Sequence, residues 1–600
     1  MEKYFIRNDQ TGYRVSILDN SFTGTSTEIF GKISFDKGKA DNILDTIRGT
    51  GLNLQLEANV NLTFDEFSEA DEQTYKTIVT KHGIIVFNGF LKPDGVIQSF
   101  VRDEWVVELD FIDGLGTLKD LSFVKSDGFN YTGKMSFYEV IEACLKRTGL
   151  SMTINSSIDL YYIGYTGTNI LKDVYVNSER FFKIDDDTIM TCEEVMNSIL
   201  NLLSACITQQ DGQWWVYRPN DFINNVMFTD NILNTTFTKN LYRKVGSQID
   251  NYYPHHSGGN QQIQTKGAIS AYRLNYKYGF KAAINSNPNL HHDNALVFDN
   301  WIKASDLHGV VLVNDFNDTM GLKMQTNFVL SGFGSFEILR SETYSILAGS
   351  QIDFIVELNN IDYTRYYYAF KLVRSDGFWA DDDGTWKNTD TFINRVVDGI
   401  STETWTLKTE PVPNNCNVYV AIYNVAAGSS TPKLAEIQSC KLINNFNYDG
   451  RIGEFHTVTR AVSPSSIVKN NQEVYNGDSI DQIFIGAIYK SDKTSLTTIW
   501  TRKDKLEEKS LLRISAEDDM RIQQKPIKCF SGSFFGEIDY LSIIEINNVS
   551  GLFMFVEYSY DTDSNITTGK LQQFYIDEVA DLNYALTFDY GKTVKPSIRS

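Results

Sequence analysis

Leu52-Asn53-Leu54-Gln55-Leu56-Glu57 is the stretch that decides the fold class, because apolar and polar residues alternate along it without a break. Successive side chains of a strand point to opposite faces, so this alternation predicts a strand with one buried and one solvent-facing side. The pattern returns in Trp105-Val-Val107-Glu-Leu109-Asp-Phe111, and a buried run at residues 83–91 stops at the turn Pro93-Asp94-Gly95. Short strands at this spacing predict a small β-barrel or sandwich for residues 1–125.

The composition points in the same direction. The chain has 600 residues, which is too many for one hydrophobic core, so several domains are expected. Aromatic residues make up 13%, with 38 Phe and 32 Tyr, whereas Pro numbers only 10. Because Phe and Tyr fit pleated, half-buried surfaces, this usage favours strands. We therefore predict a mainly β, multidomain protein.

The formal net charge of −21 limits the partners of the chain. A protein that binds duplex DNA needs a basic surface, whereas this chain as a whole has an excess of acidic residues. An acidic surface would repel a phosphate backbone, which suits the wall of a channel that DNA passes through. The same charge is also common in proteins that only need to stay in solution, so both interpretations stay open.

The cysteines and the N-terminal residues make several other classes of protein unexpected. The six cysteines are widely spaced, and Cys144 and Cys206 fall at apolar positions of helical patterns, where buried free thiols are expected. We expect no disulfide, no metal ion and no cofactor. The sequence MEKYFIRNDQ does not have the pattern of a signal peptide, and no run approaches the length of a membrane span. Synthesis in a cytoplasm is expected.

Residues 126–222 change character and predict a compact α+β domain. Ser136 and Glu139 form one capping box and Thr191 and Glu194 another, and an apolar stripe follows each of them. A hairpin at residues 205–217 turns at Asp211-Gly212. Within it, Trp214 and Trp215 must face opposite sides of one strand. One is expected in the core of this domain, and the other against a neighbouring domain or subunit.

The rest of the chain is expected to be β-rich. Residues 223–310 are polar and irregular apart from an alternating strand at 272–278. Residues 311–446 show frequent turns and strong strands without a convincing helix, which predicts a jelly-roll-like sandwich. Residues 447–600 return to strands, interrupted by one helix at about residues 511–520. The predicted fold is thus a set of small β-barrels with a two-helix α+β domain and an inserted jelly-roll-like β-sandwich.

No catalytic signature appears. The acidic triplets at 185–187 and 381–383 are consecutive, which does not fit an EF-hand, so solvated turns are the simpler interpretation. Glu193-Glu194 lies at a helix start, where carboxylates act as caps. The histidine pairs at 255–256 and 291–292 are not accompanied by a spaced third metal ligand, so surface loops are expected there. We therefore expect that the chain is not an enzyme and has no catalytic residue.

The 311–446 block supports one binding hypothesis. It places Trp379, Trp386 and Tyr367 close in sequence to Asp382. Aromatic rings can stack on the apolar face of a sugar, while carboxylate and amide groups bond to its hydroxyls. These four residues are therefore candidate glycan contacts. The alternative is that the aromatics form the sandwich core and that the block serves as a spacer or docking platform.

Several motifs resemble a recurrent tail protein of Bacteroidetes phages and prophages. They are Phe87-Asn-Gly89-Phe-Leu-Lys-Pro93-Asp94, Asp113-Gly-Leu-Gly116-Thr-Leu-Lys-Asp120 and, near the end, Trp500, Phe530-Ser-Gly532, Gly551-Leu-Phe553 and Asp589-Tyr-Gly591. The resemblance covers residues 1–220 and 450–600. It implies a hub or baseplate subunit of the tail tip, which forms a ring, usually a trimer, that joins the tail tube to spike or fibres. Gly89, Gly114 and Gly116 would serve tight strand ends there, although plain turn glycines would look the same.

Three function classes follow. A structural tail-tip subunit is the main expectation, located in the virion and assembled in the host cytoplasm. Its partners would be copies of itself, other tail proteins and genomic DNA in passage, with host-surface glycan as an open further partner. A free-standing glycan-binding protein and a tail-associated glycan-degrading enzyme are the alternatives.

Overall fold

The computed structural model describes residues 1–589, and the following positions lie outside the description: 39, 58–61, 63, 99–105, 129, 132, 179–180, 182–188, 223–224, 247–253, 259, 279–284, 286–288, 291, 293–295, 299, 305–309, 313–320, 327–335, 347–348, 362–365, 415, 428–432, 447–452, 461–467, 477–487, 494, 498, 503–507 and 576–581, together with 590–600. The described strands form seven sheets, so the predicted mainly β, multidomain class is confirmed. Every described strand path is open, so the small β-barrels of the predicted fold are not observed as closed barrels.

One sheet of 16 strands joins the two ends of the chain. β4 (Gly31–Lys37) pairs with β6 (Thr50–Glu57) on one side and with β43 (Leu552–Asp561) on the other. The alternating residues 52–57 lie in the central strand β6, in which every second residue is buried. β43 comes more than 500 residues after β4 in the sequence. Their pairing therefore joins strands near the two ends of the chain in one continuous sheet.

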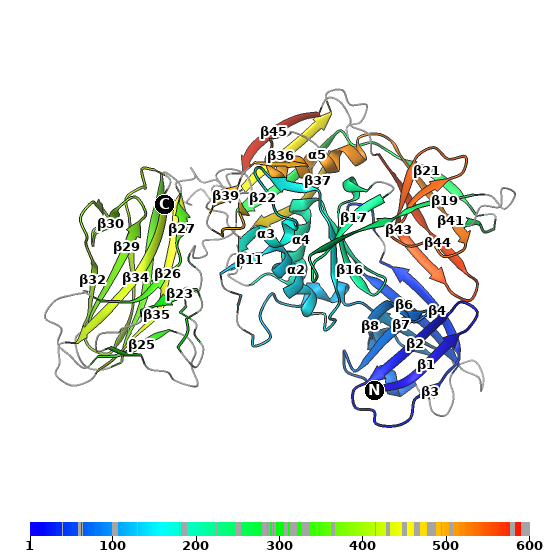
Figure 1. The fold of residues 1–600 in the computed structure, drawn as a ribbon, viewed down its shortest axis with the longest axis horizontal. Coiled ribbons are helices and arrows are strands. Elements are labelled where there is room, and N and C mark those ends of the chain that lie inside the picture. Colours follow the sequence, from blue (N-terminus) through cyan, green and yellow to red (C-terminus); the bar gives the residue numbers. More distant parts are fainter. Residues whose placement is uncertain are drawn as a thin grey trace, which may run out of the picture.

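The other strands of this sheet are β1 (Glu2–Asn8), β2 (Tyr13–Asp19), β3 (Thr27–Glu28), β7 (Tyr75–Lys81), β8 (Ile84–Leu91), β9 (Ile97–Gln98), β10 (Val106–Ile112), β19 (Tyr242–Val245), β20 (His255–His256), β21 (Gln262–Lys266), β41 (Ile527–Phe535), β42 (Ile543–Ile546) and β44 (Ile566–Phe574). Figure 1 shows its N-terminal strands at the lower right and its C-terminal strands above them.

The middle of the body contains a six-stranded sheet and the main helices. The sheet comprises β5 (Ile47–Arg48), β12 (Ile154–Ser157), β15 (Cys206–Gln210), β16 (Gln213–Tyr217), β17 (Asn225–Asp230) and β18 (Thr235–Asn240). The helices are α1 (Phe64–Ser68), α2 (Phe137–Lys146), α3 (Ile170–Asp173), α4 (Cys192–Leu203) and α5 (Leu511–Gln523), with 3-10 turns at Pro93–Gly95, Leu115–Asp120 and Pro219–Asp221. Both predicted capping boxes are formed, and the helix expected near 511–520 is α5.

Small sheets complete the body. One contains β11 (Lys134–Ser136), β14 (Tyr175–Asn177), β38 (Ile488–Tyr489) and β39 (Leu496–Thr497), and another pairs β13 (Leu160–Tyr162) with β40 (Trp500–Arg502). The third contains β22 (Ala271–Tyr278), β36 (Gly453–Arg460), β37 (Val468–Asn476) and β45 (Leu582–Asp589).

A β-sandwich lies between β22 and β36 in the sequence, although these two strands pair with each other in space. Its first sheet has β23 (Trp301–Lys303), β26 (Glu337–Ser341), β27 (Tyr344–Ile346), β29 (Tyr366–Arg374), β30 (Phe378–Ala380), β31 (Trp386–Lys387), β32 (Ile393–Val397) and β34 (Cys416–Ala427). Its second has β24 (Val310–Leu312), β25 (Leu322–Thr326), β28 (Ser350–Asn360), β33 (Ser401–Lys408) and β35 (Lys433–Phe446). We call residues 301–446 the sandwich; Figure 1 shows it at the left of the body.

Three hydrophobic cores underlie these parts, one for the large sheet, one around α2, α4 and α5, and one inside the sandwich. Trp214 belongs to the helical core, whereas the next residue, Trp215, belongs to the core of the large sheet. Trp215 therefore packs against a neighbouring part of the same chain, which is one of the two predicted alternatives for the second tryptophan. The hairpin β15–β16 is shared by both cores.

Buried polar side chains lock the parts of the body together. The side-chain amide of Gln209, in β15, donates to the Asn88 carbonyl in β8 at 2.8 Å and accepts from the Asn88 N–H at 2.7 Å. Lys37 in β4 is buried, donates to Thr208 at 3.2 Å and also bonds the Gln209 carbonyl. Burial lowers the pKa of Lys37 to about 8.

A second buried cluster connects α5 to the hairpin. Asp518 is 1% exposed and accepts hydrogen bonds from Arg218, Arg502 and Arg521. Arg218 also donates to the Leu203 carbonyl and to Asp221, each at 2.7 Å. Burial by itself would raise the pKa of Asp518, but the three guanidinium groups hold it below its ordinary value.

Gly89, Gly114 and Gly116 differ in what their positions require. Gly114 has φ 78°, so it uses the left-handed conformation that favours glycine. At Gly89 a Cβ would lie 2.6 Å from the Ile112 carbonyl oxygen, so this position needs close backbone approach. Gly116 has neither a positive φ nor a close neighbour, and the structure gives no reason for a glycine there.

The Asp518 cluster predicts the effect of Asp518→Asn. The substitution keeps the shape but leaves buried guanidinium groups without their shared carboxylate, so the free energy of unfolding should fall by about 3–5 kcal/mol. Calorimetry of the full chain would measure the change. Asp94→Asn is the matched control, because Asp94 is 77% exposed beside Lys92 and should change the free energy of unfolding by under about 1 kcal/mol. Equal effects of the two variants would contradict the structural role of Asp518.

Candidate functional site

The four candidate glycan contacts lie in or beside the eight-stranded sheet of the sandwich, but they do not form one platform. In this sheet Trp379 lies opposite Val373 and Lys387, whereas Trp386 lies opposite Ala380. Because Trp386 and Lys387 are neighbours on one strand, they point to opposite faces. Trp379 and Trp386 therefore project from opposite sides of the sheet and cannot stack on one sugar together.

Trp386 belongs to the inner side. It packs against the sandwich core, and its indole N–H donates to the Glu410 carbonyl at 2.9 Å. The guanidinium of Arg374 lies 4.9 Å from the centre of its ring. These contacts explain an aromatic residue at this position without a ligand.

The turn between β30 and β31 holds Asp382. Its carboxylate accepts from the Asn394 N–H at 2.6 Å, and the neighbouring Asp383 accepts from the Thr385 N–H and hydroxyl at 2.9 and 2.6 Å. At Gly384, φ is 84° and a Cβ would lie 2.0 Å from the Lys408 carbonyl oxygen. The triplet at 381–383 thus forms the solvated turn that the sequence predicted, while 185–187 lie outside the described residues.

Tyr367 shares the outer face with Trp379, since it lies six residues before Val373 on the same strand. At about 3.3 Å per residue, this separation is about 20 Å along the strand. Trp379 and Tyr367 therefore share the outer face but lie far apart. Of the other two candidates, Trp386 faces the core and Asp382 stabilises a turn.

The outer face carries a set of residues that the sequence analysis did not single out. Tyr419 lies opposite Val373, and Tyr423 lies opposite Ala369, which places both rings on the same side as Trp379. Phe392 packs edge-on against Tyr423 with ring centres 5.0 Å apart. All of these rings are half-buried. Alternation along one strand indicates which of its residues share a face of the sheet. Only the pairing of strands shows which residues of other strands lie on that same face.

Two cations complete this outer aromatic face, which we define as Trp379, Phe392, Tyr419 and Tyr423 with Arg340 and Lys371. Arg340 lies 4.9 Å from the ring centre of Tyr419 and bonds both carboxylate oxygens of Glu337 at 2.9 and 2.7 Å. Lys371 lies 4.1 Å from the ring centre of Phe392 and pairs with Asp390 at 2.7 Å.

The charges of the outer aromatic face are balanced locally. Hydrogen bonding to Glu337 raises the pKa of Arg340, so this side chain stays charged. Burial, followed by the nearby Glu337 carboxylate, raises the pKa of Tyr423 to about 12, so its hydroxyl remains a donor at neutral pH. The face therefore offers flat apolar rings beside fixed donors and acceptors.

A polar cavity in the body is a further candidate. It measures about 210 Å³ and is lined by residues that include Ser156, Asp159, Asn169 and Asp221. Its polar groups already bond within the chain, because Asp221 accepts from the Asp159 N–H at 2.8 Å and Asn169 donates to Asn231 at 2.7 Å. These bonds explain the side chains as structural.

The described residues form neither a metal site nor a membrane-spanning helix. Within the described ranges, no group of three or more His, Cys, Asp or Glu side chains could hold a metal ion. His255 and His256 form the short strand β20 rather than a loop, and His292 is 2% exposed against Phe298. The described part of the chain contains no helix that is long and apolar enough to span a bilayer.

Comparisons with known proteins return structural neighbours only. No protein-family model matches the sequence, and no curated protein matches it either. A tail protein from Neisseria meningitidis aligns over 94% of this chain and 97% of its own, with 9% identity and a TM-score of 0.35. A 43 kDa prophage tail protein from Shewanella oneidensis aligns over 41% of this chain and 61% of its own, with 11% identity and a TM-score of 0.23.

A third solved structure resembles part of the chain. It is the C-terminal family 22 carbohydrate-binding module of a Clostridium thermocellum xylanase, which aligns over 26% of this chain and 93% of its own, with 15% identity and a TM-score of 0.14. All three TM-scores are below 0.5, so these likenesses carry no argument about function.

The two sandwich tryptophans predict different effects on stability. Trp386→Ala removes core contacts and leaves the Glu410 carbonyl without this donor, so it should lower the free energy of unfolding of the sandwich by about 2 kcal/mol. Trp379→Ala removes a side chain of the outer face and should cost less than half of that. Calorimetry of the two full-length variants would measure both. A larger effect at Trp379 would mean that the assignment of the faces is wrong.

Proposed function

We propose that this chain is a structural subunit of a bacteriophage tail tip, in the hub or baseplate, and that it acts by assembly rather than by catalysis. The observation that carries the proposal is the pairing of β4 with β43, which makes the N-terminal and C-terminal strands one hydrogen-bonded sheet. A part that links a tail tube to spike or fibres must transmit force without separating, and a continuous sheet suits that task.

The motifs at residues 87–94 and 113–120 also support the proposal, because they resemble tail proteins of Bacteroidetes-type phages. In this proposal copies of the chain form a ring, most simply a trimer, and the ring lines the channel through which DNA leaves. The net charge of −21 suits such a wall, since an acidic surface repels the phosphate backbone. Other tail proteins would dock above and below, and the chain would assemble in the host cytoplasm.

Immunogold electron microscopy of particles tests the location. Antibodies raised against the purified chain should label the tail end that lies farthest from the capsid, at one site per particle. Particles from a strain in which the gene is deleted are the control and should show no gold. Label on the capsid or along the whole tube would contradict the proposal, as would virions in which mass spectrometry does not find the chain.

The proposal assigns the chain no chemical step. Purified protein incubated with bacterial polysaccharides should release no new reducing ends. Turnover by the protein alone would favour the glycan-degrading alternative.

Glycan binding by the sandwich is a second candidate function, favoured by the outer aromatic face. Its rings could stack on sugar, while Arg340 and Glu337 could bond to hydroxyls. Because Trp379 and Trp386 face opposite sides, the proposed site moves from the four sequence candidates to Tyr419 and Tyr423, with Trp379 at its margin.

A glycan array with the full chain tests this second function. The double variant Tyr419→Ala/Tyr423→Ala should lose at least tenfold in affinity for any glycan that the native chain binds. Thr404→Ala/Thr406→Ala, two exposed positions on the other sheet, is the matched control and should bind unchanged. A silent array with the native chain would overturn glycan binding and leave the structural proposal intact.

A further inference from the structure

Two strands at the edges of two different sheets are exposed on both of their faces. β18 ends the six-stranded sheet, and five of its six residues are exposed while the remaining one is half-buried. β21 ends a branch of the large sheet, and all five of its residues are exposed. Within the described residues, each pairs with another strand on one side only.

Such edges present unpaired backbone N–H and C=O groups, and proteins usually protect them with charges, bulges or proline. The pairing of β17 with β18 runs over all six residue pairs without a bulge. The sequence Thr235-Thr-Phe-Thr-Lys-Asn240 has high strand propensity, and its one charge, Lys239, is already paired with Asp211 at 2.6 Å. The described structure therefore leaves this edge unprotected.

The lack of acidic residues in β18 and β21 favours a second copy of this chain as the partner. Copies that each carry −21 repel one another, so they should meet where acidic residues are absent. Although the chain has 76 Asp and Glu residues, neither β18 nor β21 contains one. Another exposed edge strand, β33 in the sandwich, contains Glu403 and fits this requirement less well.

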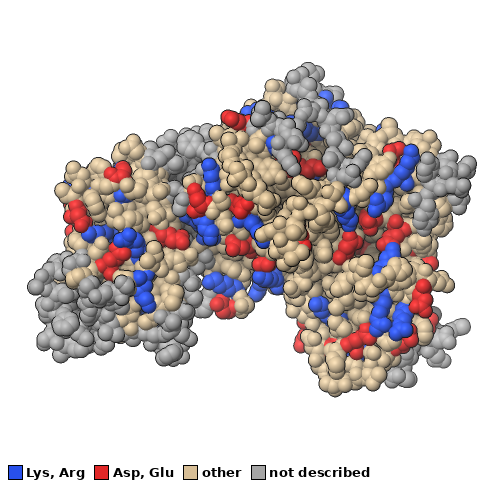
Figure 2. Space-filling model, in the orientation of Figure 1, with Lys and Arg blue, Asp and Glu red and all other residues tan. Residues whose placement is uncertain are grey.

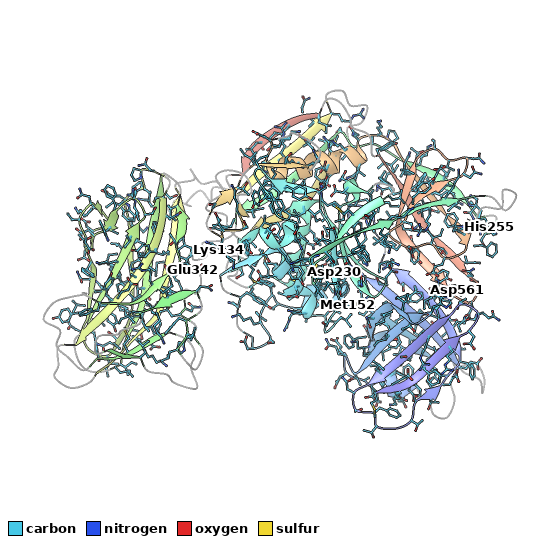
Figure 3. The ribbon with its side chains drawn as sticks, in the orientation of Figure 1. Lys134, Met152, Asp230, His255, Glu342 and Asp561 are labelled. Carbon is cyan, nitrogen blue, oxygen red and sulfur yellow. The ribbon has the colours of Figure 1, made fainter. Side chains whose placement is uncertain are left out.

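Apolar side chains lie beside both edges. The hairpin that leads into β18 exposes Ile232 at 58% and Leu233 at 68%, while Ile263 in β21 is 48% exposed. In Figure 2 uncharged residues predominate over the middle of the body, where Figure 1 places β17. Figure 3 shows Asp230, at the end of β17, in the middle of the body. It shows His255, in β20, at the right edge of the body.

From these observations we infer that β18 of one copy pairs with β21 of the next, which extends the six-stranded sheet of one copy into the large sheet of its neighbour. The inference rests on the proposed function, in which copies form a ring. Contacts between two different edges are heterologous, and such contacts close into rings when the rotation per copy allows it. The two strands have similar lengths, six and five residues, so nearly every edge group can find a partner.

Light scattering of the purified full chain provides the test. The native protein should form a closed oligomer as its concentration rises. Thr236→Glu/Thr238→Glu in β18 and, separately, Gln262→Glu/Gln264→Glu in β21 should each give monomers, because they place like charges along the edge. Thr402→Glu/Thr404→Glu in β33 adds the same charge to an exposed edge and should leave the oligomer intact. Circular dichroism would show that all variants are folded.

Mixing the two edge variants distinguishes this pairing from others. Each variant retains one intact edge, β21 in the first and β18 in the second, so the mixture should form a dimer and stop there. A mixture that stays monomeric, or an oligomer that survives either edge variant, would overturn the β18–β21 pairing while self-association stands. A native chain that stays monomeric at every concentration would instead count against the ring itself, and the inference would fail with it.

Discussion

The pairing of β4 with β43 is the constraint on which the rest of the structure depends. Ser34 to Lys37 lie opposite Asp561 to Tyr558, so strands near the two ends of a 600-residue chain share hydrogen bonds. Closing so long a loop costs only a little more entropy than closing a loop of half the length, because the cost grows with the logarithm of length. The chain between the two strands can therefore hold large additional structures without loosening the pairing.

Buried charges and amides make this arrangement specific. Lys37 lies in β4, the strand that joins the two halves of the large sheet. Its side chain bonds to the hairpin β15–β16 rather than to solvent. Asp518 gathers three guanidinium groups from separate segments around α5. Desolvation makes such groups costly when they are not fully bonded, so alternative packings of the body would leave them unsatisfied. We infer that they select one arrangement of the parts more than they stabilise it.

The sandwich is an addition that leaves the pairing of the body strands intact. Because β22 and β36 pair with each other on either side of it in the chain, the body is complete without the sandwich strands. One contact between the two parts joins Lys134 of the body to Tyr344 of the sandwich, where the ammonium group lies 5.4 Å from the ring centre. The core of the sandwich uses its own aromatics, such as Phe354 and Phe370, whereas the rings of the outer aromatic face lie outside that core.

Local features of the chain could be predicted from the sequence by itself. Ser136 with Glu139 and Thr191 with Glu194 mark helix starts because capping involves groups three residues apart, and Asp211-Gly212 marks a turn because both residues tolerate positive φ. Which strands are neighbours could be decided only by the tertiary structure. Alternation shows that one side of Leu52 to Leu56 is buried, but it does not show that β4 connects this strand to β43, or that Trp379 and Trp386 face opposite ways. A period of two residues reports the face of a strand, whereas its partners depend on hydrogen bonds and packing between segments that are far apart in the chain.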